Sequence, residues 1–231
     1  MWSELTAQPL FGIALTLCVY LGAQLLYQRL RTPLLTPVAV SIAVIIALLL
    51  AFKIPVADYQ KGGRFILFLL GPSVVALALP LYNRRAEIYA RRGPILAGVL
   101  AGALTSIVTA SGLAWLLGAS KTVVLSMAPK SVTTPIAIGI AEKIGGLPEL
   151  TAPIVVLTGC LGAMCGPEFC RLIGIRSPAA AGLAVGTAAH GIGTARMLEV
   201  DRLSGAVAGL AIGLNGLVTA FLLPLLFLIF S

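Results

Sequence analysis

Residues 203–231 read LSGAVAGLAIGLNGLVTAFLLPLLFLIFS, a run of 29 residues without a single Asp, Glu, Lys or Arg. A transmembrane helix needs about 20 apolar residues to cross the hydrocarbon core of a bilayer. The apolar character of the run is continuous, whereas strands of a membrane β-barrel alternate in segments of about 10 residues. The stretch therefore predicts a helix that is surrounded by lipid.

The rest of the chain has the same character. Six further stretches without acidic or basic side chains are Leu5–Gln28, Leu34–Phe52, Phe65–Asn83, Pro94–Ser120, Leu150–Pro167 and Ser177–Ala195. Of the 231 residues, 59% are hydrophobic and 10% are charged, whereas a soluble domain has about 25% charged residues. This composition excludes an ordinary cytosolic enzyme. It predicts an all-α fold, a polytopic transmembrane bundle of about 7–8 membrane segments.

The 16 basic and 8 acidic residues leave a net charge of +8. Most basic residues stand in short segments between the apolar runs, at residues 29–31, 61–64, 84–92 and 171–176. Cationic loops of membrane proteins stay on the cytoplasmic side, so residues 84–92 and 171–176 are predicted to lie inside. The positive charge therefore indicates topology, and no nucleic-acid partner is expected.

Residues 128–139 read APKSVTTPIAIG and interrupt the apolar pattern with two prolines. Pro129 and Pro135 break helices and bias the preceding residue away from helical angles. Thr134 is predicted to cap a helix that begins at Pro135 and ends at the following glycine pair. About ten residues at 1.5 Å each cover only half of a bilayer. Residues 121–146 are therefore predicted to enter and leave on one side, with a helix N-terminus at depth that suits an anion.

Residues 186–196 read GTAAHGIGTAR and include His190, the single histidine of the chain. A serine–proline pair at 177–178 predicts the start of the helix leading into this stretch. Its two later glycines predict a break, after which Thr194 caps a new helix. If the break is small, Thr187, His190 and Thr194 share one helix face. A histidine here can be a packing residue, but polar groups at membrane depth are expensive and mark functional sites.

Together, the two interrupted segments predict a substrate site. Its candidate residues are Lys130, Ser131, Thr133, Thr134, Thr187, His190, Gly191, Gly193, Thr194 and Arg196. Two polar residues outside these segments are candidates for coupling or gating. Glu168 either couples a proton or, as we favour, pairs with Arg171, while Asn215 either lines a cavity or joins two helices.

Faint internal similarities predict an inverted repeat. LTPV at residues 35–38 parallels LTAPI at 150–154, and the small-residue pattern at 97–102 parallels that at 208–213. Both offsets are near half the chain length. We expect a single membrane domain over residues 1–231, with repeats at 34–120 and 149–231 around the broken segment 121–146. Small residues four apart predict close helix packing; they are Gly98/Gly102, Gly162/Gly166, Gly182/Gly186 and Gly209/Gly213.

Metal, cofactor and enzyme functions find little support in the sequence. Cys160, Cys165 and Cys170 recur every five residues, so they do not share a helix face and are expected to be apolar fillers. Neither a nucleophile elbow nor a phosphate-binding loop is present, and a catalytic role is not expected.

KSVTTPIA at residues 130–137, LTA at 150–152, TG at 158–159 and AHGIGTA at 189–195 resemble the LrgB/CidB family of bacterial membrane proteins. The resemblance covers nearly the whole chain in order, spacing and length. One departure is Met197, which stands where a small residue is expected. The resemblance implies a multi-pass protein of the bacterial inner membrane, accompanied by a small LrgA/CidA-like membrane partner.

The same resemblance implies two functions. Related plastid proteins move glycolate and glycerate, and some bacterial pairs are associated with pyruvate uptake. We therefore expect a secondary transporter of small monocarboxylates that works by alternating access. We also expect the protein to form a homo-oligomer, with a dimer favoured. Threonine hydroxyls, Lys130, His190 and Arg196 would complement such an anion, and His190 could carry a proton. The alternative is a holin/antiholin-like regulator of murein hydrolase activity and autolysis.

Overall fold

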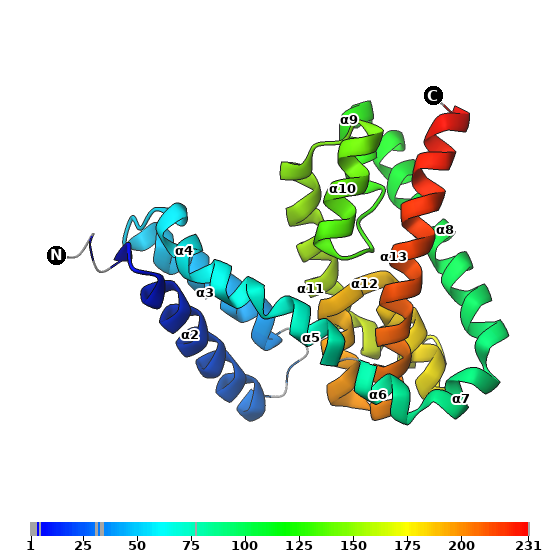
Figure 1. The fold of residues 1–231 in the computed structure, drawn as a ribbon, viewed down its shortest axis with the longest axis horizontal. Coiled ribbons are helices and arrows are strands. Elements are labelled where there is room, and N and C mark those ends of the chain that lie inside the picture. Colours follow the sequence, from blue (N-terminus) through cyan, green and yellow to red (C-terminus); the bar gives the residue numbers. More distant parts are fainter. Residues whose placement is uncertain (1–3, 5, 31, 33–34, 77, 231) are drawn as a thin grey trace. The chain divides into compact units, whose positions relative to one another are not determined.

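The computed structural model describes residues 4, 6–30, 32, 35–76 and 78–230, and over these residues the chain is built of helices joined by short turns (Figure 1). The all-α expectation is confirmed. Residue contacts divide the chain into two compact units, residues 1–78 and 79–231.

The first unit contains α2 (Pro9–Leu30), α3 (Pro37–Ala51), α4 (Val56–Phe68) and α5 (Leu70–Ala76). Its helices close on an apolar cluster of Ile45, Leu49 and Ile54, against which side chains of α2 pack. Gly12 and Gly62 let α2 and α4 approach so closely that a Cβ on Gly12 would lie 2.5 Å from the carbonyl oxygen of Tyr59.

Helix α4 begins at Val56, before the apolar run that starts at residue 65. One sequence expectation for this region is wrong. Within residues 65–83, α4 ends at Phe68, α5 begins at Leu70, and α6 (Ala78–Asn83) follows, whereas the apolar run predicts one span. Proline explains the break between α4 and α5, because its ring clashes with the carbonyl four residues earlier. Pro72 stands four residues after Phe68, the last residue of α4.

The second unit carries the interrupted segments. Its further helices are α7 (Arg85–Ala90), α8 (Arg92–Leu116), α9 (Lys121–Met127), α10 (Thr134–Ile144), α11 (Pro148–Leu172), α12 (Pro178–Val200) and α13 (Arg202–Phe230). In the described part of the chain, four helices are long and apolar enough to cross a membrane: α2, α8, α11 and α13. Helix α3, with 15 residues, falls short of the roughly 20 that a crossing needs.

Residues 121–146 form a first hairpin in which α10 returns to the level of α9. The backbone N–H of Leu147 donates to the Ser126 hydroxyl at 2.8 Å, and the Thr151 hydroxyl donates to the Ser126 carbonyl at 3.0 Å. Helix α10 ends at Gly145, whose left-handed φ of 86° suits glycine. The expected fold-back and stop are both present, although α10 begins at Thr134, with Thr133 as its cap.

Residues 178–200, helix α12, form a second hairpin whose two halves meet at a kink. Ala189 and His190 have non-helical backbone angles. Beyond them the chain folds back, because a Cβ on Gly193 would lie 3.2 Å from the carbonyl oxygen of Val185. In a continuous helix, residues eight apart are separated by about 12 Å. The break therefore lies one residue before the glycines that were expected to cause it, and Thr194 stands inside the returning segment.

The hairpins approach α13 from opposite ends (Figure 1). The first hairpin packs with Leu223, near the end of α13, in a cluster that includes Val132 and Ile140. The second begins beside the start of α13, where the Ser204 hydroxyl donates to the Pro178 carbonyl at 2.9 Å. Both hairpins therefore pack along α13, one from each of its ends, toward the middle of the unit.

Glycine allows these close approaches at three of the four predicted pairs. Added Cβ atoms on Gly98 and Gly102 of α8, Gly162 and Gly166 of α11, and Gly182 and Gly186 of α12 would meet neighbouring helices within 3.0 Å. The fourth pair departs from the expectation. Gly209 and Gly213 of α13 have open space around them within the described residues.

Candidate functional site

The two hairpin tips meet at Asn215, in the middle of α13. Its amide nitrogen donates to the backbone carbonyl of Ser131 and to that of Thr187, both at 3.0 Å. Both carbonyls belong to interrupted helices, where backbone groups lose their usual partners. Asn215 is 1% exposed. Of its two predicted roles, the structure therefore shows the helix-joining hydrogen bond.

A cation and two hydroxyls lie at the first tip. The Nζ of Lys130 donates to Ser131 Oγ at 3.1 Å and to Ser106 Oγ, from α8, at 3.2 Å. The two serine oxygens are 2.6 Å apart. None of the ion pairs found among the described residues involves Lys130. This half-buried ammonium group is held by neutral oxygen atoms alone.

His190 stands at the second tip and is 4% exposed. Its Nε2 lies 2.8 Å from the Val155 carbonyl of α11. A carbonyl only accepts, so Nε2 must carry a proton. Gly159, one turn along α11, makes room for the ring, because a Cβ there would lie 2.7 Å from His190 Cε1. The backbone of His190 has φ 40° and ψ −134°, a region that normally requires glycine.

Two threonines of the second hairpin are buried with unpaired hydroxyls. Thr187 is 5% exposed and Thr194 is 1% exposed. Neither Oγ1 has a hydrogen-bond partner within the described structure. Leaving a buried hydroxyl unsatisfied costs about 1–3 kcal/mol, so such groups call for an explanation, and a ligand or ordered water is the simplest one.

The tip cluster, as we call it, consists of Ser106, Lys130, Ser131, Thr187, His190 and Asn215. Thr133 and Thr134 follow it directly at the start of α10, and the Thr133 side chain makes no capping bond there. Gly191 is exposed beside His190, whereas Gly193 packs inside the second hairpin.

Arg196 and Glu168 take part in a separate ion-pair group. Arg196 contacts Glu199 at 3.1 Å and Glu168 at 3.9 Å, and Glu168 also contacts Arg171 at 2.9 Å. The favoured prediction of a Glu168–Arg171 pair is confirmed. Arg196, a predicted site residue, forms its ion pairs with these carboxylates.

Sequence reasoning missed Ser106, Gly159 and the Val155 carbonyl. Ser106 is one of several hydroxyl residues in α8, and such residues usually bond to their own helix backbone, as Thr109 does to Thr105. No local signal separates the two behaviours. Contact with a hairpin that lies 24 residues away decides the role of Ser106.

The tip cluster combines groups that suit a small anion. Among the described residues, it offers an ammonium group without a carboxylate counter-ion, the buried unpaired hydroxyl of Thr187 and the uncapped start of α10. A buried charge is costly unless it is paired, and a bound anion would supply the pair. A lysine that holds two serine oxygens can also activate a serine nucleophile, as in Ser–Lys hydrolases.

Comparison with known proteins shows the family to which this chain is related. Residues 16–229 match the LrgB-like family. The chain belongs to this family. The match spans every residue of the tip cluster, from Ser106 to Asn215. The LrgB-like relationship and the apolar helices make this a multi-pass bacterial membrane protein.

Individual LrgB-like relatives cover nearly the whole chain. The uncharacterised protein YxaC of Bacillus subtilis is 38% identical over 218 residues, 94% of this chain and 95% of the relative. The holin-like protein CidB of Staphylococcus aureus is 34% identical over 223 residues, 96% and 97% of the two chains. The antiholin-like protein LrgB of Bacillus mycoides is 32% identical over 225 residues, 95% and 96%. No solved structure matches the chain.

Proposed function

We propose that this protein is a holin/antiholin-like membrane component that controls murein hydrolase activity and autolysis. The observation that carries the proposal is the naming of its relatives, since proteins called holin-like and antiholin-like align over about 95% of the chain. Such a role involves a small LrgA/CidA-like partner and assembly of several copies, a dimer being the simplest. Neither the partner nor the assembly requires a catalytic group in this chain.

Autolysis of a bacterial host that lacks its own family members tests this proposal. Cells producing the protein, with and without the small partner, should differ from empty-vector cells in the rate of detergent-induced lysis. They should also differ in the hydrolase bands of a murein gel. An unrelated multi-pass protein made at the same level is the control, because membrane loading alone can cause lysis. Equal lysis rates in all strains would contradict the proposal.

A second candidate function is transport of small monocarboxylates, such as glycolate, glycerate or pyruvate. The tip cluster favours it, because Lys130 has hydroxyl partners and no acidic one among the described residues. A carboxylate could accept from Lys130 while a hydroxyl or keto oxygen meets Thr187. Two hairpins that enter from opposite ends resemble the inverted-repeat plan of secondary transporters, in which alternating access occurs around such a site.

Uptake of labelled pyruvate, glycolate and glycerate into proteoliposomes tests the second function. Saturable uptake of one acid is expected, with loss in Lys130→Met and in Thr187→Val. Thr134→Val and His190→Ala test the neighbouring positions. Thr109→Val is the matched control, since Thr109 is exposed and bonds only to its own helix. Absence of uptake with and without the partner would exclude transport of these acids and leave the regulator as the proposed function.

Labelling by a serine-reactive fluorophosphonate separates both proposals from catalysis. If Ser131 or Ser106 is an activated nucleophile, the probe should label the protein, and Lys130→Met should abolish the labelling. We expect no labelling, because a hydrolase also needs donors placed for a developing oxyanion.

A further inference from the structure

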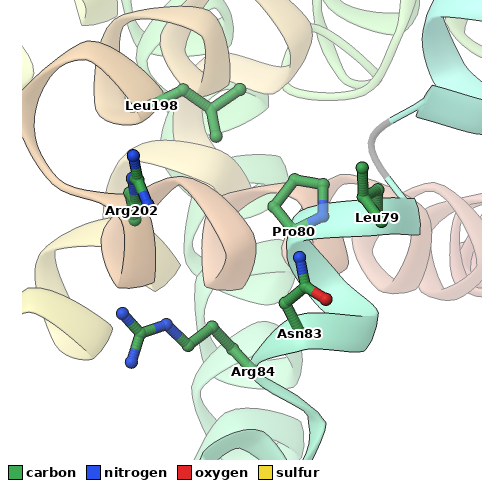
Figure 2. Close-up of a pocket in the computed structure, with 6 residues that line it drawn as sticks. All are labelled: Leu79, Pro80, Asn83, Arg84, Leu198 and Arg202. Atoms are coloured by element: carbon green, nitrogen blue, oxygen red, sulfur yellow. The ribbon is translucent and has the colours of Figure 1, made fainter.

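A pocket of about 470 Å³ lies between α6 and the junction of α12 with α13 (Figure 2). Helix α6 contributes Leu79, Pro80 and Asn83, and Arg84 follows it directly. From the other side come Leu198, near the end of α12, and Arg202, the first residue of α13. The pocket thus joins the root of the second hairpin to the short helices that precede α8.

The pocket combines an apolar wall with two guanidinium groups. Leu79, Pro80 and Leu198 form the wall, while Arg84, Arg202 and the Asn83 amide supply hydrogen-bond donors (Figure 2). The Arg202 side chain makes no hydrogen bond or ion pair within the part of the chain that the structure describes. Arg84 pairs with Glu87 at 2.6 Å, with 42% of its side chain exposed. Arg202 is therefore a cation without a counter-ion, held beside hydrocarbon.

Nearby carboxylates are already engaged. Asp201 precedes Arg202, but its Oδ1 accepts from the backbone N–H groups of Leu203 and Ser204, both at 2.9 Å. Glu87 is held by Arg84. Neither acid forms an ion pair with Arg202, so an external anion can bind the Arg202 guanidinium group, while Arg84 shares its charge with Glu87 and Asp201.

The surroundings of the pocket are typical of the membrane–water boundary. Arg85 lies over the ring of Tyr82 at 4.2 Å, and Arg92 lies over the ring of Tyr89 at 4.3 Å. Both tyrosines are more than 60% exposed. Exposed tyrosines gather at the level of lipid headgroups, and arginines on the cytoplasmic side face anionic lipids. The pocket belongs to this arginine-rich end.

We propose that this pocket binds an anionic phospholipid. The phosphodiester accepts from Arg202 and Arg84, and one acyl chain follows Leu79, Pro80 and Leu198. Arginine suits the role because its planar guanidinium binds two phosphate oxygens together. A water-soluble phosphate would make no contact with the apolar wall, whereas a phospholipid would contact both the wall and the arginines. The lipid is therefore the favoured ligand. The proposal does not depend on what the tip cluster binds.

Lipid retention by the purified full-length chain tests the proposal. Native mass spectrometry in detergent should show retained phosphatidylglycerol in preference to phosphatidylcholine with the same acyl chains. Arg202→Gln should weaken phosphatidylglycerol binding about tenfold, the effect of losing one charge-assisted contact. Leu198→Asn should also weaken lipid binding, because it makes the wall polar. Melting in lipid-free detergent shows whether each variant is folded, and Arg202→Gln should melt like the parent chain.

Arg176→Gln is the matched control, because it removes one exposed arginine from the α11–α12 turn, outside the pocket. If Arg176→Gln weakens binding as much as Arg202→Gln, the lipid is attracted only by net charge and the proposal is wrong. Equal retention of the two lipids would also overturn it. Competition by inorganic phosphate at the concentration at which the lipid saturates would show a site for free phosphate instead.

Discussion

The side-chain amide of Asn215 donates a hydrogen bond to the backbone carbonyl of Ser131 across 3.0 Å, although 84 residues separate the two in the chain. A second bond from the same nitrogen reaches Thr187. One amide group thus holds the tips of two hairpins that approach from opposite ends of α13. The stability of both tips, and of whatever they bind, should depend on this residue.

Asn215→Leu should lower the free energy of unfolding by about 2 kcal/mol or more, since it leaves two buried carbonyls without their partner. Thermal melting of the purified protein in detergent measures the change. Thr219→Val is the control on the same helix, because Thr219 makes only a long 3.4 Å contact with Asn215. Equal melting temperatures for Asn215→Leu and the parent chain would show that the tips are held by other contacts.

His190→Gly should be more stable than His190→Ala by about 1 kcal/mol. Both changes remove the bond to Val155, but only glycine adopts a φ of 40° without strain. Melting temperatures of the two variants, compared directly, give the answer. An alanine variant as stable as the glycine variant would mean that the second tip relaxes to another conformation.

Gly186→Ala should destabilise the protein by about 1–3 kcal/mol, because its Cβ would lie 2.6 Å from the backbone of Ala208. Gly213→Ala should be neutral or stabilising, since open space surrounds it and alanine favours a helix by up to about 1 kcal/mol. The pair is compared by unfolding in detergent. A large loss of stability or of assembly in Gly213→Ala would place a partner surface on that face of α13.

Asp201→Ala should cost about 1 kcal/mol at neutral pH, because Asp201 caps the first turn of α13. The pKa of the Asp201 carboxyl is lowered, and the largest of several causes is the hydrogen bond that it accepts from the backbone N–H of Ser204. A lowered pKa stabilises the fold above the unfolded value of about 3.9, and the gain is lost as pH falls through the folded value.

The melting difference between the parent chain and Asp201→Ala should therefore shrink below about pH 4. Asp201→Asn keeps an acceptor oxygen and should show no such dependence. A difference that stays constant down to pH 3 would mean that the charge of Asp201 contributes nothing.

Cysteines introduced at residues 147 and 175, at the two ends of α11, should be labelled from opposite sides of the membrane. The background is a variant in which the four natural cysteines are replaced by alanine. The arginines at residues 171 and 176 predict that residue 175 is cytoplasmic. Labelling of both positions from one side would contradict α11 as a span and remove the support for an inverted repeat.

Composition and local pattern determined the helical class, the membrane setting and the two interruptions. Proline acts within four residues, so the breaks near Pro129 and Pro135 and the stop at Gly145 could be predicted from the sequence. The same local rule explains the break between α4 and α5 before Pro72, in a stretch that hydropathy alone reads as one span.

Tertiary structure alone decided which polar groups meet. Asn215 and Ser106 sit in uninterrupted apolar helices, and their role arises from contact with hairpin tips that are distant in sequence. Arg196 and Lys130 both belong to interrupted segments, yet Arg196 pairs with carboxylates while Lys130 meets only hydroxyls. Backbone propensity is local, whereas the partner of a buried charge depends on which distant helix faces it, and that is a property of the packed fold.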